Sequence, residues 1–225
     1  MLLVISALKG YAIEASDGRI GSVSDFLFDD KTWRVRWLIV DTGGWLSGRQ
    51  VLVHPSAIGP ADFDQNQLPV SLTKSQVEGS PDVLRDEPIS RSVEDKLFSY
   101  YRWDPTWAGG YLGPSSGAMA SPLGTPPYFG IGISPDAADI TPDEKDPDPK
   151  RRSVADITGY HIHASDGEIG HVENFVMDSD SWTIRYLIVA TRNWWQGQHV
   201  LISPAAVKKT SGLGGFCNST WHAIK

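Results

Sequence analysis

Three histidines and two glutamates form the group of residues in this sequence that best matches a chemical site. They are His161, His163, Glu168, His171 and Glu173. His161 and His163 are two residues apart on an expected strand, so their side chains point to one face, and the other three follow across a turn. Imidazole and carboxylate groups together can bind a transition metal. No residue is placed to orient the imidazoles, so we interpret the group as a solvated outer face and expect no metal.

Other catalytic arrangements are absent from the sequence. Residues 16–18 and 165–167 both read Ser-Asp-Gly, which is typical of a tight turn. Cys217 has no histidine at the spacing of a catalytic pair, since His222 follows five residues later in a segment without a clear pattern. There is no nucleophile elbow, phosphate-binding loop or pair of catalytic carboxylates. The sequence therefore predicts a protein that is not an enzyme and needs no cofactor.

Arginine and tryptophan side chains are the candidate residues for binding a partner. They are Arg36, Arg185, Trp45, Trp194 and Trp195. The two arginines lie in the middle of expected strands, where a guanidinium must reach solvent or pair with an acid. Structural pairing and partner recognition beside Trp33 or Trp182 both stay open. The three tryptophans are expected at one rim of the fold, where they either dock a partner or pack between two domains.

An internal repeat positions these residues. A shift of 149 positions aligns residues 10–58 with residues 159–207 without a gap, and about half of the pairs are identical. Arg36 thereby corresponds to Arg185, and Trp45 to Trp194. Such self-similarity predicts two copies of one structural unit. Since a one-residue slip would exchange the faces of every strand, we expect the same strand pairings in both copies.

Each copy reads as four short strands with no helix between them. In the first copy the strands are expected at residues 11–15, 20–28, 33–42 and 51–53. The third strand is central, because its apolar run needs cover on both faces. We expect Trp33, Trp37 and Leu38 to be buried, as well as their equivalents Trp182, Tyr186 and Leu187. Short strands joined by polar turns are typical of a small, strongly bent antiparallel β-barrel.

Several of these blocks resemble the PRC-barrel family, named for the cytoplasmic domain of the photosynthetic reaction centre H subunit. The blocks are Gly10-Tyr11, Ser16-Asp17-Gly18, Ile20-Gly21, the strand at 33–40 and Val51–Pro55. Residues 70–77, 80–81, 88–91 and 100–103 resemble the tail of stand-alone bacterial members. The resemblance implies a tandem duplication of a six-stranded barrel that serves as a docking platform, in the reaction centre and in a ribosome maturation factor alike. It implies no reaction.

Two short helices are expected after the first barrel. Thr73 followed by Gln76 forms a capping box, and Gly79 ends that helix. A second helix begins near Ser92. Its apolar stripe includes Leu97 and is expected to close the open side of the barrel; an exposed aromatic docking face is the alternative.

The expected fold is mainly β, with two PRC-type barrels and a long linker. We assign residues 1–103 to the first barrel and its helices, 104–157 to a flexible linker rich in Gly and Pro, and 158–225 to the second barrel. The linker length would let the barrels take almost any relative position. After Val207 the second copy matches the first only through a weak echo, Thr220 for Thr73. If that echo fails, the second copy lacks a strand and a lid, and the first barrel or a second chain would cover its core.

Composition narrows the class of protein. The chain has 225 residues, a net charge of −7 and a pI near 5.3, which argues against a nucleic-acid surface. A single cysteine excludes an intramolecular disulfide and is compatible with the cytoplasm, where we expect the protein. No stretch of about 20 apolar residues is present, so no transmembrane segment is expected. The apolar start at residues 1–7 is expected to be an edge strand or a frayed end.

Two classes of function therefore stay open. The first is a non-enzymatic interaction module or adaptor that binds a protein partner or another copy of the chain. The alternative is a factor similar to the reaction centre H subunit, linked to the light reaction and electron transfer of photosynthesis, that associates peripherally with a membrane complex. An acidic chain without a spanning segment favours the first class.

Overall fold

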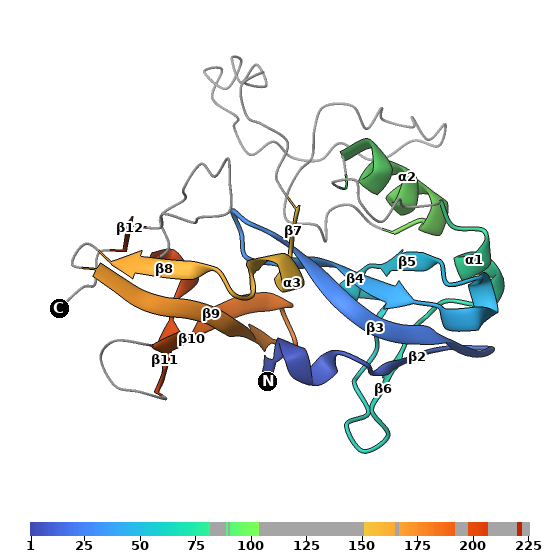
Figure 1. Ribbon diagram of the computed structural model, residues 1–225. Helices are drawn as coiled ribbons and strands as arrows, with labels where there is room; N and C mark the ends of the chain where they lie inside the picture. Colours follow the sequence, from blue (N-terminus) through green and yellow to red (C-terminus); the bar gives the residue numbers. More distant parts are fainter. Residues whose placement is uncertain are drawn as a thin grey trace, which may run out of the picture.

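The computed structural model describes residues 1–81, 89, 91–103, 151–164, 167–191, 198–206 and 220–221. Two six-stranded sheets lie beside each other (Figure 1). The first sheet has the order β5-β4-β3-β2-β6, and β7 pairs with β3. Its strands are β2 (Ala12–Ala15), β3 (Gly18–Asp29), β4 (Val35–Asp41), β5 (Gln50–Val53), β6 (Gln67–Pro69) and β7 (Arg151–Ser153).

The second sheet has the corresponding order β11-β10-β9-β8-β12, and β1 pairs with β9. Its strands are β8 (His161–Ala164), β9 (Gly167–Asp178), β10 (Thr183–Thr191), β11 (His199–Ile202), β12 (Thr220–Trp221) and β1 (Leu2–Val4). The short helices are η1 (Ile5–Leu8), η2 (Gly43–Leu46), η3 (Pro55–Ala57), α1 (Lys74–Glu78), α2 (Arg91–Tyr101), α3 (Val154–Ile157) and η5 (Pro204–Ala206).

The strand pairings of the two sheets correspond residue for residue except at β6 and β12. There Pro69 faces Glu14 and Thr220 faces His163, so Thr220 takes the place of Pro69 and not that of Thr73. In the first sheet Phe26 faces Leu38, and in the second Phe175 faces Leu187, 149 positions later in each strand. Even the two β-bulges of the β3–β4 pair recur at the equivalent places of the β9–β10 pair. The prediction of matching strand pairings is confirmed, and bulges at equal positions give the two sheets the same local bends.

Neither sheet closes on itself within the described residues. β5 and β6 stand at opposite ends of the first sheet, as β11 and β12 do in the second. The nearest approach to closure is a single bridge between Ile58 and Val70, in the segments that follow β5 and β6. The closed barrels expected from the sequence are therefore seen here as open sheets.

Each half of the chain contributes one strand to the sheet of the other half. β1, at the start of the chain, pairs with β9, so that Leu2 faces Asp178. β7, just before the second half, pairs with β3, so that Arg151 faces Asp29. These two pairings are again related by the shift of 149 positions. The predicted linker boundary at 104–157 is wrong at its end, because residues 151–157 form β7 and α3.

The two sheets also meet directly through their backbones. The N–H of Val35 donates to the carbonyl of Trp182 at 2.8 Å, and the N–H of Ile184 donates to the carbonyl of Trp33 at 2.8 Å. A single bridge joins Arg34 to Thr183 between these bonds. One hydrophobic core runs through both halves. The expectation that the barrels could take almost any relative position is therefore wrong, since exchanged strands and a shared core fix them.

Both helices expected after β6 are present, but α2 does not close the open side of a barrel as predicted; it covers the outer face of the first sheet. α1 begins with a capping box between Thr73 and Gln76. α2 lies over β4 and β5 (Figure 1) and packs Leu97 and Phe98 against the outer face of the first sheet. That outer face consists of Leu27, Trp37 and Leu52, with the partly buried Ile39 beside them.

The burial predicted for the residues of the central strand is confirmed in the first half, but it is wrong at one position of the second half. Trp37 and Leu38 are fully buried, Trp182 and Leu187 are buried, and Trp33 is half-buried. Tyr186, which occupies the position of Trp37, remains 38% exposed. The prediction for Tyr186 is wrong because no helix of the described residues covers the second sheet as α2 covers the first.

Candidate functional site

A buried cluster of charges joins the exchanged strand to the helix that covers the first sheet. The Arg151 guanidinium donates to both carboxylate oxygens of Glu94, each at 2.6 Å, and to Asp29 Oδ2 at 2.9 Å. Trp37 Nε1 donates to Glu94 Oε1 at 2.7 Å. Burial alone would lower the pKa of Arg151, but the bonds to Glu94 and the charge of Asp29 raise it. The cluster joins α2 to β7 through Arg151 and to β4 through Trp37.

His54 lies beside this cluster in an aromatic surrounding. Its ring meets Trp37, Phe98 and Trp103 at centroid distances of 5.3, 5.1 and 5.6 Å. The backbone N–H of Ser56 donates to Nδ1 at 3.2 Å, so Nδ1 is the unprotonated ring nitrogen. Burial, together with the charges of two nearby arginines, lowers the pKa of His54 from 6.5 to about 3. The imidazole is therefore neutral at physiological pH and serves as a packing group.

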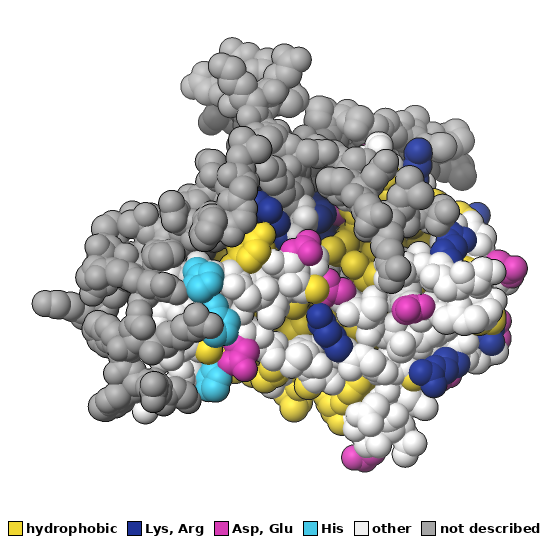
Figure 2. Space-filling view, viewed as in Figure 1, with side chains coloured by type: hydrophobic (Ala, Val, Ile, Leu, Met, Phe, Trp, Pro, Cys, Tyr) yellow, Lys and Arg dark blue, Asp and Glu magenta, His cyan; other side chains and the backbone are white. Residues whose placement is uncertain are grey.

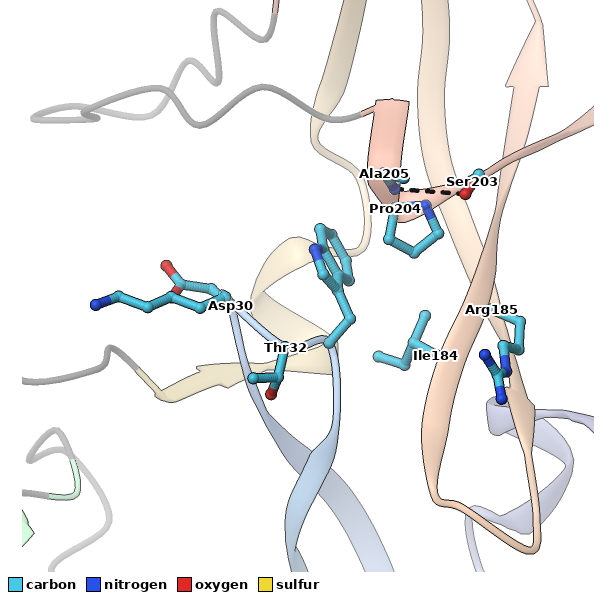
Figure 3. A pocket seen from close by; sticks show the side chains of 9 residues that line it. Asp30, Thr32, Ile184, Arg185, Ser203, Pro204 and Ala205 are labelled. Carbon is cyan, nitrogen blue, oxygen red and sulfur yellow. Dashed lines mark hydrogen bonds between the residues drawn. The ribbon is translucent and has the colours of Figure 1, made fainter. Parts of the chain in front are cut away.

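Two grooves lie at equivalent places along the junction of the halves. The first, of about 630 Å³, lies between the turn after β3 and the segment Ser203–Ala205 (Figure 3). The second, of about 710 Å³, lies between the turn after β9 and the segment that contains Pro55. Trp33 lines the first groove and Trp182 the second, 149 positions apart. Neither groove is lined by Arg151, Glu94 or His54.

The two grooves differ in their chemistry. Asp30, Lys31 and Arg185 bring charge to the first groove. Apolar side chains line much of the second groove; they include Met1, Leu3, Leu8, Ile58, Phe63, Leu68 and Met177.

The structure separates the two arginines that the sequence treats as equivalent. Arg36 is only 8% exposed, and burial lowers the pKa of its guanidinium while the charge of Glu94 opposes that change. The Arg185 side chain is 52% exposed, with Nη2 at 3.5 Å from Asp178 Oδ2. Arg185 is one of the residues that line the first groove (Figure 3), and Trp33 is another, so recognition of a partner by a guanidinium beside an indole stays a prediction.

Of the three candidate tryptophans, the structure describes one. Trp45 is 38% exposed, and the Lys74 ammonium lies 5.6 Å from the centroid of its ring. That contact is a cation–π pair at a solvated site, which contributes about 0.5–1 kcal/mol. Trp194 and Trp195 lie outside the described residues. Whether the indoles of the two halves share one rim therefore stays a prediction.

The histidine-rich group forms part of an exposed surface. The rings of His161 and His171 are 6.3 Å apart, and His199 Nε2 lies 2.5 Å from Glu173 Oε2. Figure 2 shows histidine side chains gathered on this side of the molecule. The side chains of His163 and Glu168 lie outside those that the structure describes. In the described part of the chain, no three His, Cys, Asp or Glu side chains are grouped closely enough to hold a metal ion.

The sequence led us to expect a second copy without a lid, but it did not identify the outer face of the second sheet as a binding surface. Tyr186 takes the place of Trp37, and Leu201, which is 60% exposed, takes the place of the buried Leu52. Val176 and Ile188 complete this outer face and are only partly buried. The available signal was the loss of repeat similarity after residue 207, since the segments equivalent to α1 and α2 have no counterpart in the alignment.

Comparison with known proteins identifies the first half. Residues 4–76 form a PRC-barrel domain. The matched residues begin at the last residue of β1 and end within α1, so they leave out β7, which completes the first sheet. An uncharacterised protein of Deinococcus radiodurans is 39% identical over 77 residues, which cover 34% of this chain and 27% of that protein. Among the described residues, no helix has the length and apolar character needed to cross a membrane.

Proposed function

We propose that this chain is a non-enzymatic interaction module built from two copies of the PRC-barrel domain. The residue-for-residue agreement of strand pairings and bulges supports the second copy, together with the repeat in the sequence. The saturated hydrogen bonds of Arg151 and Glu94 support a structural use of the buried charges.

One observation carries the proposed binding role. The outer face of the second sheet exposes Tyr186 and Leu201, whereas the same face of the first sheet is covered by α2. Large apolar side chains that share an exposed sheet face are typical of a protein-binding surface. We therefore assign the binding of a protein partner to the outer face of β9, β10 and β11. No observation on the described residues favours the reaction-centre alternative.

Capture of partners from a lysate of the native cell tests this function. The chain is immobilised as the wild type, as the double variant Tyr186→Ser/Leu201→Ser, and as Phe63→Ser. Phe63 is a matched control because it is 44% exposed but lines the second groove instead. We expect the double variant to lose a specific partner that Phe63→Ser retains. If all three proteins captured the same partner equally, the binding surface would lie elsewhere on the chain. If none of them captured a specific partner, the interaction function itself would be refuted.

A further inference from the structure

The structure shows what kind of element covers the outer face of such a sheet. In the first sheet the cover is α2, an amphipathic helix that places Leu97 and Phe98 on Trp37. One turn earlier in the helix, Glu94 accepts a hydrogen bond from Trp37 Nε1. The face is therefore matched by a helix that carries a carboxylate followed by an apolar and aromatic pair.

The second sheet presents the same arrangement of contact positions. Because the strand registers are equal, Tyr186 and Leu201 have the relative placement of Trp37 and Leu52. The phenol of Tyr186 can donate a hydrogen bond to a carboxylate, as the indole of Trp37 does. Leu2, at the position equivalent to Arg151, is 55% exposed and extends the apolar surface.

The charge of Arg185 indicates which residue the bound helix should carry. Arg185 corresponds to Arg36, and Arg36 lies within electrostatic reach of Glu94 in the first sheet. The exposed guanidinium of Arg185 meets one carboxylate, Asp178, at the long distance of 3.5 Å. An incoming carboxylate would therefore be attracted here, and a lysine or arginine at the same place of a helix would be repelled.

We infer that the outer face of the second sheet binds an amphipathic helix of a partner protein, with an acidic residue one turn before an apolar and aromatic pair. This inference rests on the proposed interaction function and names its partner class. The α2 helix of the same chain is not the ligand, because its Glu94 is fixed by Arg151 on the first sheet. A second copy of the chain is less favoured, since a face-to-face dimer would bring two Arg185 side chains near each other.

A labelled peptide with the sequence of residues 89–103 serves as the probe, and its binding to the full chain is measured by fluorescence anisotropy. We expect saturable binding to the wild type. Tyr186→Ser/Leu201→Ser and Arg185→Glu should each raise the Kd at least tenfold, because they remove the apolar contact and reverse the charge. Arg19→Glu, an exposed charge reversal on the first sheet, should leave the Kd unchanged. A peptide with Glu94→Lys should bind at least tenfold more weakly.

Several outcomes would overturn the inference. If the peptide does not bind the wild type, the inference is wrong. If the wild type and the double variant bind it with equal Kd, the peptide exchanges with α2 on the first sheet, and the inference is again wrong. A wild-type dimer by light scattering that Leu201→Ser converts to a monomer would assign the face to a second copy. If the peptide fails while lysate capture still depends on Tyr186 and Leu201, the helix inference falls but the interaction function stands. Circular dichroism checks that each variant is folded.

Discussion

Removal of the Arg151 side chain should strongly destabilise the protein. The side chain is 7% exposed and binds Glu94 through two nitrogens and Asp29 through a third. Arg151→Ala leaves both carboxylates buried without their cation. Breaking a buried pair in this way costs about 3–5 kcal/mol, because the remaining charge has lost its partner away from water. That loss is a large part of the 5–15 kcal/mol by which a typical domain is stable.

Urea unfolding followed by tryptophan fluorescence measures the effect, since Trp37 lies directly against the cluster. With a slope of about 2 kcal/mol per M, the midpoint should fall by about 2 M. Arg152→Ala is a matched control on the same strand. Arg152 is 37% exposed and 3.8 Å from Asp30 Oδ2, so its loss should cost about 1 kcal/mol or less.

The combination Arg151→Ala/Glu94→Gln provides a further check. It removes one of the two stranded charges, so it should recover part of the stability that Arg151→Ala loses. Equal midpoints for Arg151→Ala and Arg152→Ala would refute the reasoning, since burial and pairing would then have no energetic effect. A double variant that is less stable than Arg151→Ala alone would show that Glu94 acts mainly through its contact with Trp37.

Three further changes have expected outcomes. The folded pKa of His54 is about 3 and its unfolded value 6.5, so the unfolded state binds the proton first and stability should fall between pH 6.5 and 3, by roughly 2 kcal/mol at pH 5. Urea unfolding of His54→Leu should show a clearly flatter pH dependence. Gly21→Ala would place Cβ 2.1 Å from the Asp41 carbonyl and should cost about 1–3 kcal/mol, whereas Gly44→Ala meets no atom within 4 Å; a similar midpoint for both would contradict this. Trp45→Ser should change the unfolding free energy by less than about 1 kcal/mol because the indole is exposed, and a collapsed melting temperature would show that it is core.

Much of the fold follows from local patterns in the sequence. The apolar alternation and the gapless repeat predict the four strands of each half and their register, and the pairings of Phe26 and Phe175 agree with them. The capping box at Thr73 and the apolar stripe around Leu97 predict α1 and α2. These features depend on residues close in sequence, whose side chains carry the signal.

The exchange of strands could not be predicted in this way. Arg151, Arg152 and Ser153 are polar, and they join the first sheet through backbone pairing with residues far away in the sequence. Backbone pairing leaves little trace in the side-chain pattern. The alignment gives no help either, since residues 2–8 and 151–157 share no identical pair.

The candidate site shows the same limit. Arg36 and Arg185 occupy equivalent positions, yet one is buried and the other exposed. The difference comes from α2, which covers the first sheet alone among the described residues. A sequence repeat predicts equal burial of equivalent residues only where the elements that cover them are repeated as well. Among the described residues no counterpart of α2 covers Tyr186, so Tyr186 is exposed.

The reciprocal strand exchange has a consequence for the order of folding. Near Asp29, one edge of β3 pairs with the adjacent β4, but the other edge pairs only with β7, which contains Arg151, 122 positions later. Loop closure over such distances makes the final pairing slow, and an unpaired strand edge invites contact with other chains until then. Folding of the first sheet therefore cannot be completed on the ribosome before the start of the second half emerges. Once formed, the two sheets should unfold in one cooperative transition, since neither retains all its strands without the other.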